Sequence, residues 1–180
     1  MGEIIRAARV EDAPGITTVH IKSWQTTYRG IVSDDYLDNL DKEYEQRVPR
    51  RVRALSEPRE DRFTFVAQAD DGQIVGFIHG GPERENDPLY RGELYAIYLL
   101  QEYQGRGLGT RLTRALVKEL LGVGLDTMLV WVAVGNPARA FYRALGGQFV
   151  RTKQDEIRGV TLQEEAYGWR DIRPLLKGAE

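Results

Sequence analysis

The feature that most constrains this chain is a glycine-rich turn, Gln104-Gly105-Arg106-Gly107-Leu108-Gly109. An apolar run typical of a β-strand precedes it at 93–100, and leucines spaced by three or four residues predict a helix after it. A strand-to-helix turn of this kind directs backbone N–H groups and the positive end of a helix toward one point. Glycine leaves that point open because it has no Cβ. The turn therefore predicts an anion site, with a merely tight connection as the alternative.

Two familiar phosphate-binding motifs do not fit this turn. The dinucleotide fingerprint requires a third glycine at position 110, where the chain has Thr110, and the Gly-Lys-Ser/Thr triplet of a P-loop does not occur. A small-molecule kinase or another nucleotide enzyme is therefore disfavoured.

The absence of one residue type excludes several kinds of chemistry. The 180 residues contain no cysteine and two histidines. A disulfide framework, a thiolate zinc site, an iron–sulfur cluster and a cysteine nucleophile are therefore excluded. Two histidines leave little for a histidine-rich metal site, so we expect no metal. The length predicts a single domain over residues 1–180.

Charge is distributed unevenly along the chain. Residues 1–90 carry 12 basic and 17 acidic side chains, whereas residues 91–180 carry 13 and 10. Two interpretations of this split are open. It arises by chance, or an acidic ligand binds the second half of the chain and a cationic ligand binds the first. The overall charge of −2 argues against a nucleic-acid-binding protein. No run reaches the ~18 apolar residues of a membrane span, and the first residues lack signal-peptide features, so we expect a cytoplasmic protein.

Hydrophobic periodicity predicts a mixed sheet with helices on both faces. Helices are expected from about Glu11, from Ser33 to about Leu55 with a break near Pro49, after the glycine turn, and over 137–145 with Asn136 as N-cap. The glycine and proline content of 80–88 predicts a loop. Strands are expected at 3–7, 63–69, 73–79, 93–100, 127–134, 148–154 and 160–168.

Three motifs together resemble one family. The Gln-x-x-Gly-x-Gly pattern at 104–109 resembles the pyrophosphate loop of the GCN5-related N-acetyltransferase (GNAT) superfamily. Leu94-Tyr-Ala-Ile-Tyr-Leu99 resembles that family's bulged fourth strand, and Asn136-Pro-Ala-Arg-Ala-Phe-Tyr142 resembles a segment near its fifth strand. The resemblance covers about residues 3–168. It implies an α+β fold with a splayed, mostly antiparallel mixed sheet of about seven strands and helices on both faces.

The resemblance also implies acetyl-CoA as co-substrate, lying between the fourth and fifth strands. Loop N–H groups would bind the pyrophosphate, strand backbone would pair with the pantetheine arm, and the N–H of Leu99 would polarise the thioester carbonyl. Asn136 would bind the arm or act only as N-cap, and Arg106 and Arg139 would meet phosphates or lie on solvated helix faces. The implied cofactor-binding set is Ile97, Tyr98, Leu99, Gln104, Gly105, Arg106, Gly107, Leu108, Gly109, Thr110, Asn136, Arg139 and Tyr142.

Acetyl transfer to an amine requires two proton transfers. Tyr142 matches the family's general acid for the leaving thiolate. An acceptor ammonium with a pKa of ~10.4 is mostly protonated at neutral pH, so a base is useful. Glu93 at the start of the fourth strand is the leading candidate, with His79 or water as alternatives. Trp24 and Tyr28 share a helix face that walls the acceptor pocket or belongs to the core.

The sequence therefore predicts an acetyl-CoA-dependent N-acetyltransferase. Without cysteine, the acetyl group is expected to pass directly to a primary amine of a small molecule or peptide in a ternary complex. A non-catalytic acyl-CoA sensor or interaction module is the alternative. Dimers are common in the family, and the sequence leaves the oligomeric state open.

Overall fold

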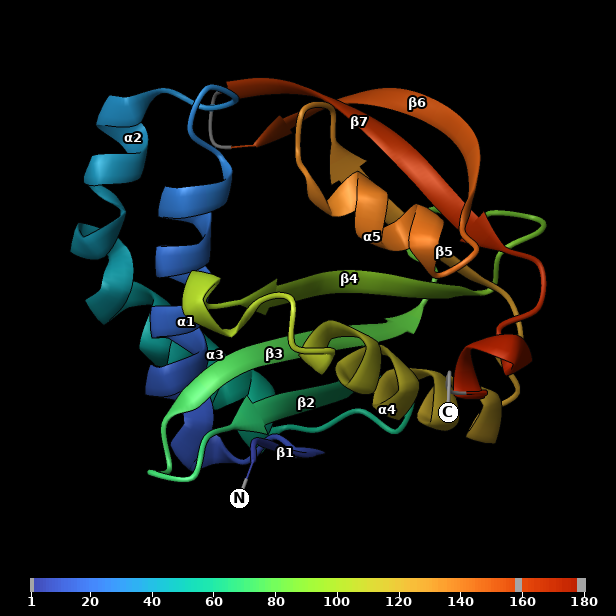
Figure 1. Ribbon diagram of the computed structural model, residues 1–180, viewed down its shortest axis with the longest axis horizontal. Coiled ribbons are helices and arrows are strands. Elements are labelled where there is room, and N and C mark those ends of the chain that lie inside the picture. The colour runs from blue at the N-terminus through green and yellow to red at the C-terminus, as the bar shows by residue number, and fades with distance from the viewer. Residues whose placement is uncertain (1, 158–159, 178–180) are drawn as a thin grey trace.

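The computed structural model describes residues 2–157 and 160–177, and these form a seven-stranded sheet in the order β1-β2-β3-β4-β5-β7-β6 (Figure 1). Neighbouring strands are antiparallel except for β4 and β5, which are parallel. This mixed sheet confirms the predicted fold class. The strands are β1 (Ile4–Ala7), β2 (Phe63–Gln68), β3 (Ile74–Pro82), β4 (Gly92–Leu99), β5 (Met128–Ala133), β6 (Gln148–Ile157) and β7 (Val160–Trp169).

Helices cover both faces of the sheet. On one face, here called the α1 face, α1 packs against α3, β3 and β4. On the other, the α4 face, α4 packs across β2, β3 and β4, and α5 lies beside the start of α4 (Figure 1). None of the described helices is long and apolar enough to cross a bilayer. The helices are α1 (Ala13–Thr27), α2 (Asp34–Asp38), α3 (Tyr44–Ser56), α4 (Leu108–Gly122) and α5 (Ala138–Ala144).

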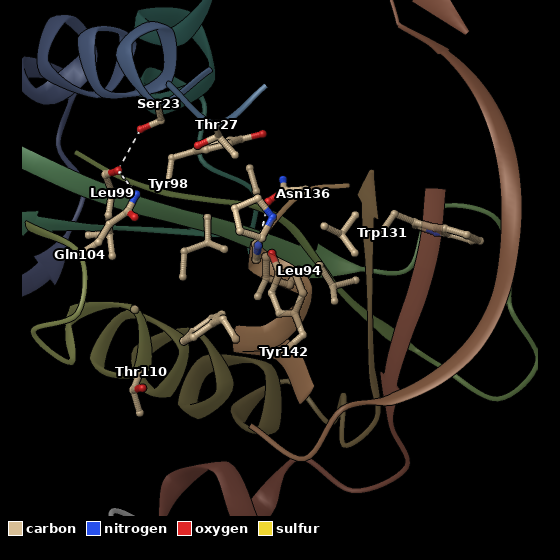
Figure 2. Close-up of a pocket in the computed structure, with 18 of the residues that line it drawn as sticks. Ser23, Thr27, Leu94, Tyr98, Leu99, Gln104, Thr110, Trp131, Asn136 and Tyr142 are labelled. Atoms are coloured by element: carbon tan, nitrogen blue, oxygen red, sulfur yellow. Dashed lines mark hydrogen bonds between the residues drawn. The ribbon is translucent and has the colours of Figure 1, made fainter. Parts of the chain in front are cut away.

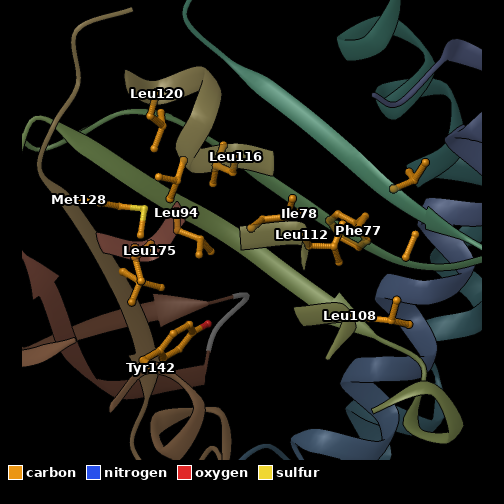
Figure 3. Packing of buried hydrophobic residues seen from close by; sticks show 14 of the residues in the cluster. Phe77, Ile78, Leu94, Leu108, Leu112, Leu116, Leu120, Met128, Tyr142 and Leu175 are labelled. Carbon is orange, nitrogen blue, oxygen red and sulfur yellow. The ribbon is translucent and has the colours of Figure 1, made fainter. Parts of the chain in front are cut away.

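The main core lies between α4 and the sheet. Leu112, Leu116 and Leu120 follow one another at helical spacing and are fully buried. They belong to the same buried cluster as Ile78 and Leu94 (Figure 3). Each such leucine contributes roughly 1.5–3 kcal/mol relative to an exposed one. This packing fixes α4, and with it the glycine turn, against β4.

The predicted helix over 33–55 is two helices, and the predicted break at Pro49 is wrong. Ser33 caps α2 as expected, because its Oγ accepts the N–H of Tyr36 at 3.4 Å. Asn39 ends α2 by donating its side-chain N–H to Asp35 O at 2.7 Å, and a 3₁₀ turn leads into α3. Pro49 lies inside α3, which has no buried residue. The interruption therefore comes from a local side-chain bond, not from proline.

Two other boundaries differ from prediction. The first helix starts at Ala13, after a 3₁₀ turn, because the Asp12 carboxylate accepts the Arg9 N–H at 2.7 Å and pairs with Arg6. The predicted loop at 80–88 begins later, since β3 continues through Pro82 to pair with the start of β4.

Candidate active site

The sheet opens between β4 and β5. These strands pair only where Gly92–Leu94 meets Met128–Val130, and from Tyr95 onward β4 has no partner strand on that side among the described residues. A cavity of about 430 Å³ occupies this opening (Figure 2). Val130 and Val132 line it from the α4 face and Trp131 from the α1 face, because alternate residues of a strand point to opposite faces. The cavity therefore connects the two faces of the sheet.

A β-bulge shapes the cavity side of β4. His79 pairs with Ala96 and Gly80 with Leu94, which leaves Tyr95 as the extra residue. The Leu100 N–H donates to Val75 O on the β3 side at 2.9 Å. Because backbone groups alternate in an antiparallel ladder, the N–H and C=O of Leu99 face the opening. The Leu99 carbonyl there accepts hydrogen bonds from Ser23 Oγ at 3.1 Å and Gln104 Nε2 at 3.2 Å.

The glycine turn forms one end of the cavity. Gly105 and Gly107 have φ values of +72° and +78°, in the left-handed region that other residues adopt only under strain. Gly107 precedes the first turn of α4, whose leading N–H groups have no partner within the helix. A Cβ on Gly109 would lie 3.1 Å from the Phe141 ring, so α5 packs closely on the turn. The arrangement fits the predicted anion site.

Tyr142 reaches from α5 into the cavity (Figure 2). Its side chain is 5% exposed. Burial, together with the neighbouring Tyr28 hydroxyl, raises the pKa of Tyr142 above its ordinary value. The phenol therefore keeps its proton at neutral pH, as a general acid must before it acts.

Tyr28, Tyr98 and Asn136 line the α1 side of the cavity. Burial raises the pKa of Tyr28, and side-chain hydrogen bonds with Tyr98 and Asn136 partly offset this shift. Asn136 Oδ1 also accepts the N–H of Ala138, the first residue of α5, at 2.8 Å, but the helix starts one residue later than predicted and Pro137, not Asn136, stands at its N-cap position. A role for Asn136 in binding the cofactor stays a prediction.

Most of the predicted cofactor-binding residues line the cavity, and three do not. Arg106 lies 3.5 Å from Glu3, and Arg139 lies 3.2 Å from Glu165. Leu108 is buried in the main core, so only its backbone is suited to a ligand. The residues brought together are Ile97, Tyr98, Leu99, Gln104, Gly105, Gly107, Gly109, Thr110, Asn136 and Tyr142.

The two predicted bases lie outside the cavity lining. The Glu93 carboxylate is 2% exposed and accepts from Arg84 through Nε at 3.0 Å and Nη2 at 2.5 Å. His79 lines a second cavity and contacts Thr64 Oγ1 at 2.8 Å and Phe63 O at 3.1 Å. Burial lowers the pKa of His79 to about 4. A catalytic role for either residue stays a prediction, and both are held by other partners.

Trp24 contacts two residues that line the cavity. It stacks on Tyr28 with ring centroids 4.1 Å apart, and its Nε1–H donates to the Tyr98 hydroxyl at 3.0 Å. Of the predicted substrate-binding residues, only Tyr28 lines the cavity.

Sequence reasoning missed several wall residues, namely Ser23, Thr27, Trp131 and Phe141. Trp131 lies within a continuously apolar strand, and no local pattern distinguishes a side chain that faces a cavity from one that faces the core. Phe141 stood beside Tyr142 in the recognised motif, and its position against the glycine turn depends on how α5 packs.

Comparison with known proteins decides the family, because the model of the acetyltransferase (GNAT) family matches residues 22–146. The chain belongs to the GNAT family. The predicted resemblance is thereby confirmed, and the chain is an N-acetyltransferase. It is 41% identical over 172 residues to YuaI of Bacillus subtilis (strain 168), an uncharacterized N-acetyltransferase, with 95% of each chain covered.

A second curated relative matches over a shorter stretch, whereas solved structures match over nearly their whole length. A mycothiol acetyltransferase of Saccharomonospora viridis is 34% identical over 118 residues, which cover 60% of this chain and 39% of that protein. Among solved structures, the PaiA N-acetyltransferase of Thermoplasma acidophilum in complex with coenzyme A has a TM-score of 0.66 and 25% identity, and covers 92% of this chain and 98% of that one. The yncA acetyltransferase of Salmonella typhimurium with acetyl-CoA shares the fold, with a TM-score of 0.64 and 19% identity over 100% of this chain and 97% of that one.

Proposed function

We propose that the protein transfers the acetyl group of acetyl-CoA directly to a primary amine in a ternary complex. One observation carries this proposal: a glycine turn, a strand N–H and a protonated phenol all border one cavity. Bound acetyl-CoA supplies the acetyl group as an activated thioester. The chain has no cysteine to form the usual thioester intermediate, which favours direct attack by the amine.

Each group bordering the cavity has a task in the proposal. The N–H groups around Gly107 hold the pyrophosphate, and the unpaired edge of β4 binds the pantetheine arm. The Leu99 N–H donates to the developing oxyanion, and Tyr142 protonates the departing thiolate. The described residues hold no group of three His, Asp or Glu side chains suited to a metal.

Replacing the proposed acid tests the chemistry. Tyr142→Phe is expected to lower kcat by roughly 10²–10⁴-fold and to leave acetyl-CoA affinity nearly unchanged, because only the proton donor is lost. Tyr90→Phe, which also removes a hydroxyl from a buried tyrosine, is the control and should keep full activity. Coenzyme A release is measured with phenethylamine, cadaverine, methionine and an unblocked peptide. Acetyl-CoA binding without turnover of any acceptor would favour the sensor or interaction module.

Replacing a loop glycine tests the cofactor site. Gly107→Ala forces a Cβ onto a left-handed residue, and it is expected to raise the Kd for acetyl-CoA about tenfold or more, because the turn loses its shape. Gly124→Ala carries the same kind of backbone strain at the far end of α4, where φ is +81°. Isothermal titration should show weakened binding in the first variant only. Equal weakening in both would place the pyrophosphate elsewhere.

We expect the protein to act in the cytoplasm.

A further inference from the structure

The wall of the active-site cavity carries no charged side chain among the residues that the structure describes. Its lining contains no Asp, Glu, His, Lys or Arg, and the predicted bases Glu93 and His79 lie outside it. A charge brought against such a wall stays unpaired and costs free energy. Away from the glycine turn, the cavity therefore favours a neutral ligand. The polar side chains of the lining are those of Ser23, Thr27, Tyr28, Tyr95, Tyr98, Gln104, Thr110, Trp131, Asn136 and Tyr142.

The titratable groups of this lining are four tyrosines, and each keeps its proton at neutral pH. Burial raises the pKa of Tyr28, Tyr95, Tyr98 and Tyr142 above the ordinary value. The described lining therefore offers proton donors and no base. The charged groups that face these phenols from behind the lining are Glu164 toward Tyr28, and Asp61, Arg62, Arg84 and Glu93 toward Tyr95.

Tyr28 and Tyr98 together hold more hydrogen-bond donors than their neighbours can accept. The Trp24 indole N–H donates to the Tyr98 hydroxyl at 3.0 Å, and an indole nitrogen can only donate. The Asn136 amide oxygen accepts the Ala138 N–H at 2.8 Å, so the atom that Asn136 presents to Tyr28 is its donating nitrogen. Both phenol oxygens therefore accept from their neighbours. The bond that the two phenols share uses only one of their two protons.

One phenol proton is thus left without an acceptor among the described residues. Tyr98, Asn136 and Tyr142 border the same cavity as Tyr28, so this proton lies at the cavity wall (Figure 2). A ligand that displaces water from the wall loses affinity unless it replaces the hydrogen bond that water makes there. Tyr28 and Tyr98 lie on the α1 side, away from the glycine turn. The oxygen that accepts this proton therefore belongs to the acceptor substrate.

We propose that the acceptor binds as a neutral amine with a carbonyl group beside its amino carbon, which is the α-amino group of an amino-acid amide or of a peptide. Its carbonyl oxygen accepts the free phenol proton, and its nitrogen faces the thioester. An α-amino group of this kind has a pKa of ~7.7–8.0, compared with ~10.4 for a lysine-type amine. At pH 7 roughly a tenth of it is neutral, compared with roughly one part in 2,500. This inference rests on the proposed function and names its substrate class.

One phenol is enough to balance the protons when the amine is neutral. The ammonium form loses its proton to water before it enters the cavity. The neutral nitrogen attacks the thioester carbonyl carbon, the C–N bond forms, and the C–S bond breaks with its electron pair remaining on sulfur. Tyr142 protonates that thiolate, and a proton of the attacking nitrogen restores the phenol as the amide forms. No second base is needed, which agrees with a described lining that has none.

The pH dependence of turnover tests whether the amine enters neutral. We compare L-phenylalaninamide with phenethylamine, which differ in the carboxamide group. The acidic limb of each kcat/KM profile should bend at the pKa of that acceptor, so the two bends should lie about two pH units apart. At pH 7 the amide should have at least tenfold higher kcat/KM. A bend at one shared pH for both acceptors would reveal a base in the protein and overturn the inference.

Binding of the two products tests the carbonyl separately, because both products are neutral. With coenzyme A bound, the unmodified protein should bind N-acetylphenylalaninamide at least fivefold more tightly than N-acetylphenethylamine. Tyr28→Phe/Tyr98→Phe removes both phenol protons and should make the two Kd values equal. Tyr36→Phe is the control, since it removes a hydroxyl that packs on the same buried cluster outside the cavity lining, and it should keep the difference.

Three results of the binding experiment contradict the assignment of the phenol proton. Equal product affinities in the unmodified protein, or a preference that persists in Tyr28→Phe/Tyr98→Phe, overturn recognition of the carbonyl. Weaker acetyl-CoA binding by the same double variant would assign the phenol proton to the thioester and also overturn it.

An unblocked peptide that begins with phenylalanine separates the two sources of the α-amino group. Whichever of the peptide and L-phenylalaninamide has the higher kcat/KM carries the group that the cavity recognises, and either order supports the inference. Failure of the proposed function appears differently, as no coenzyme A release with any acceptor by the unmodified protein.

Discussion

Two glutamates on the α1 face, Glu93 and Glu164, lie in opposite electrostatic situations. They flank β5 on neighbouring strands, and both are almost fully buried, at 2% and 9% exposure. The Glu93 carboxylate accepts hydrogen bonds from the guanidinium and the backbone N–H of Arg84. Glu164 has no such partner among the described residues. Burial alone therefore does not tell what a carboxylate does, because its partners decide whether it belongs to a buried ion pair.

Removing the partner of Glu93 should produce the largest change in stability. Arg84→Met leaves a buried carboxylate without its donors, and it is expected to lower the free energy of unfolding by about 1–3 kcal/mol. Arg91→Met is the matched control from the same loop, because Arg91 is similarly exposed but pairs with exposed Asp126. Urea denaturation should show little change in the control. Similar losses in both variants would mean that the buried Arg84–Glu93 pair contributes no more to stability than an exposed ion pair.

Neutralising each glutamate should change stability in opposite directions. Glu164→Gln removes an unpaired buried charge and is expected to raise the free energy of unfolding by about 1 kcal/mol at neutral pH. Glu93→Gln removes the carboxylate that accepts hydrogen bonds from the Arg84 guanidinium, and it should lower the free energy of unfolding. Thermal and urea unfolding of the two variants measure this directly. A loss of stability in Glu164→Gln would indicate a structural bond and remove the contrast.

The smallest expected effect is a pH dependence of the stability difference between the unmodified protein and Glu164→Gln. The folded-state pKa of Glu164 is raised, so the folded protein holds more protons there than the unfolded chain between the ordinary value near 4.5 and the raised one. The stability of the unmodified protein, relative to Glu164→Gln, should therefore increase as pH falls through this window. Paired unfolding curves at several pH values test it, and a constant difference would contradict the raised pKa.

Much of the fold could be predicted from local pattern. The leucines of α4 repeat at helical spacing, and the strands alternate or run apolar, so element types were predicted well. Boundaries were less accurate where a side chain decided them, as with Asn39 at the end of α2 and Asp12 before α1. The predicted helix is interrupted at Asn39, and Pro49, where the break was predicted, lies inside α3.

The sequence by itself determined the glycine turn, the helix after it and the aromatic pair at the start of α5, because these depend on residues close together in the chain. It also excluded cysteine chemistry outright. Only the tertiary structure decided which glutamate forms an ion pair, since Arg84 reaches Glu93 across a loop, while Lys153, opposite Glu164 on β6, pairs with Glu85. Ion pairs depend on distances between strands that local sequence does not specify. The same packing placed Trp131 in the wall of the cavity, where the sheet parts after only three residues of β4–β5 pairing.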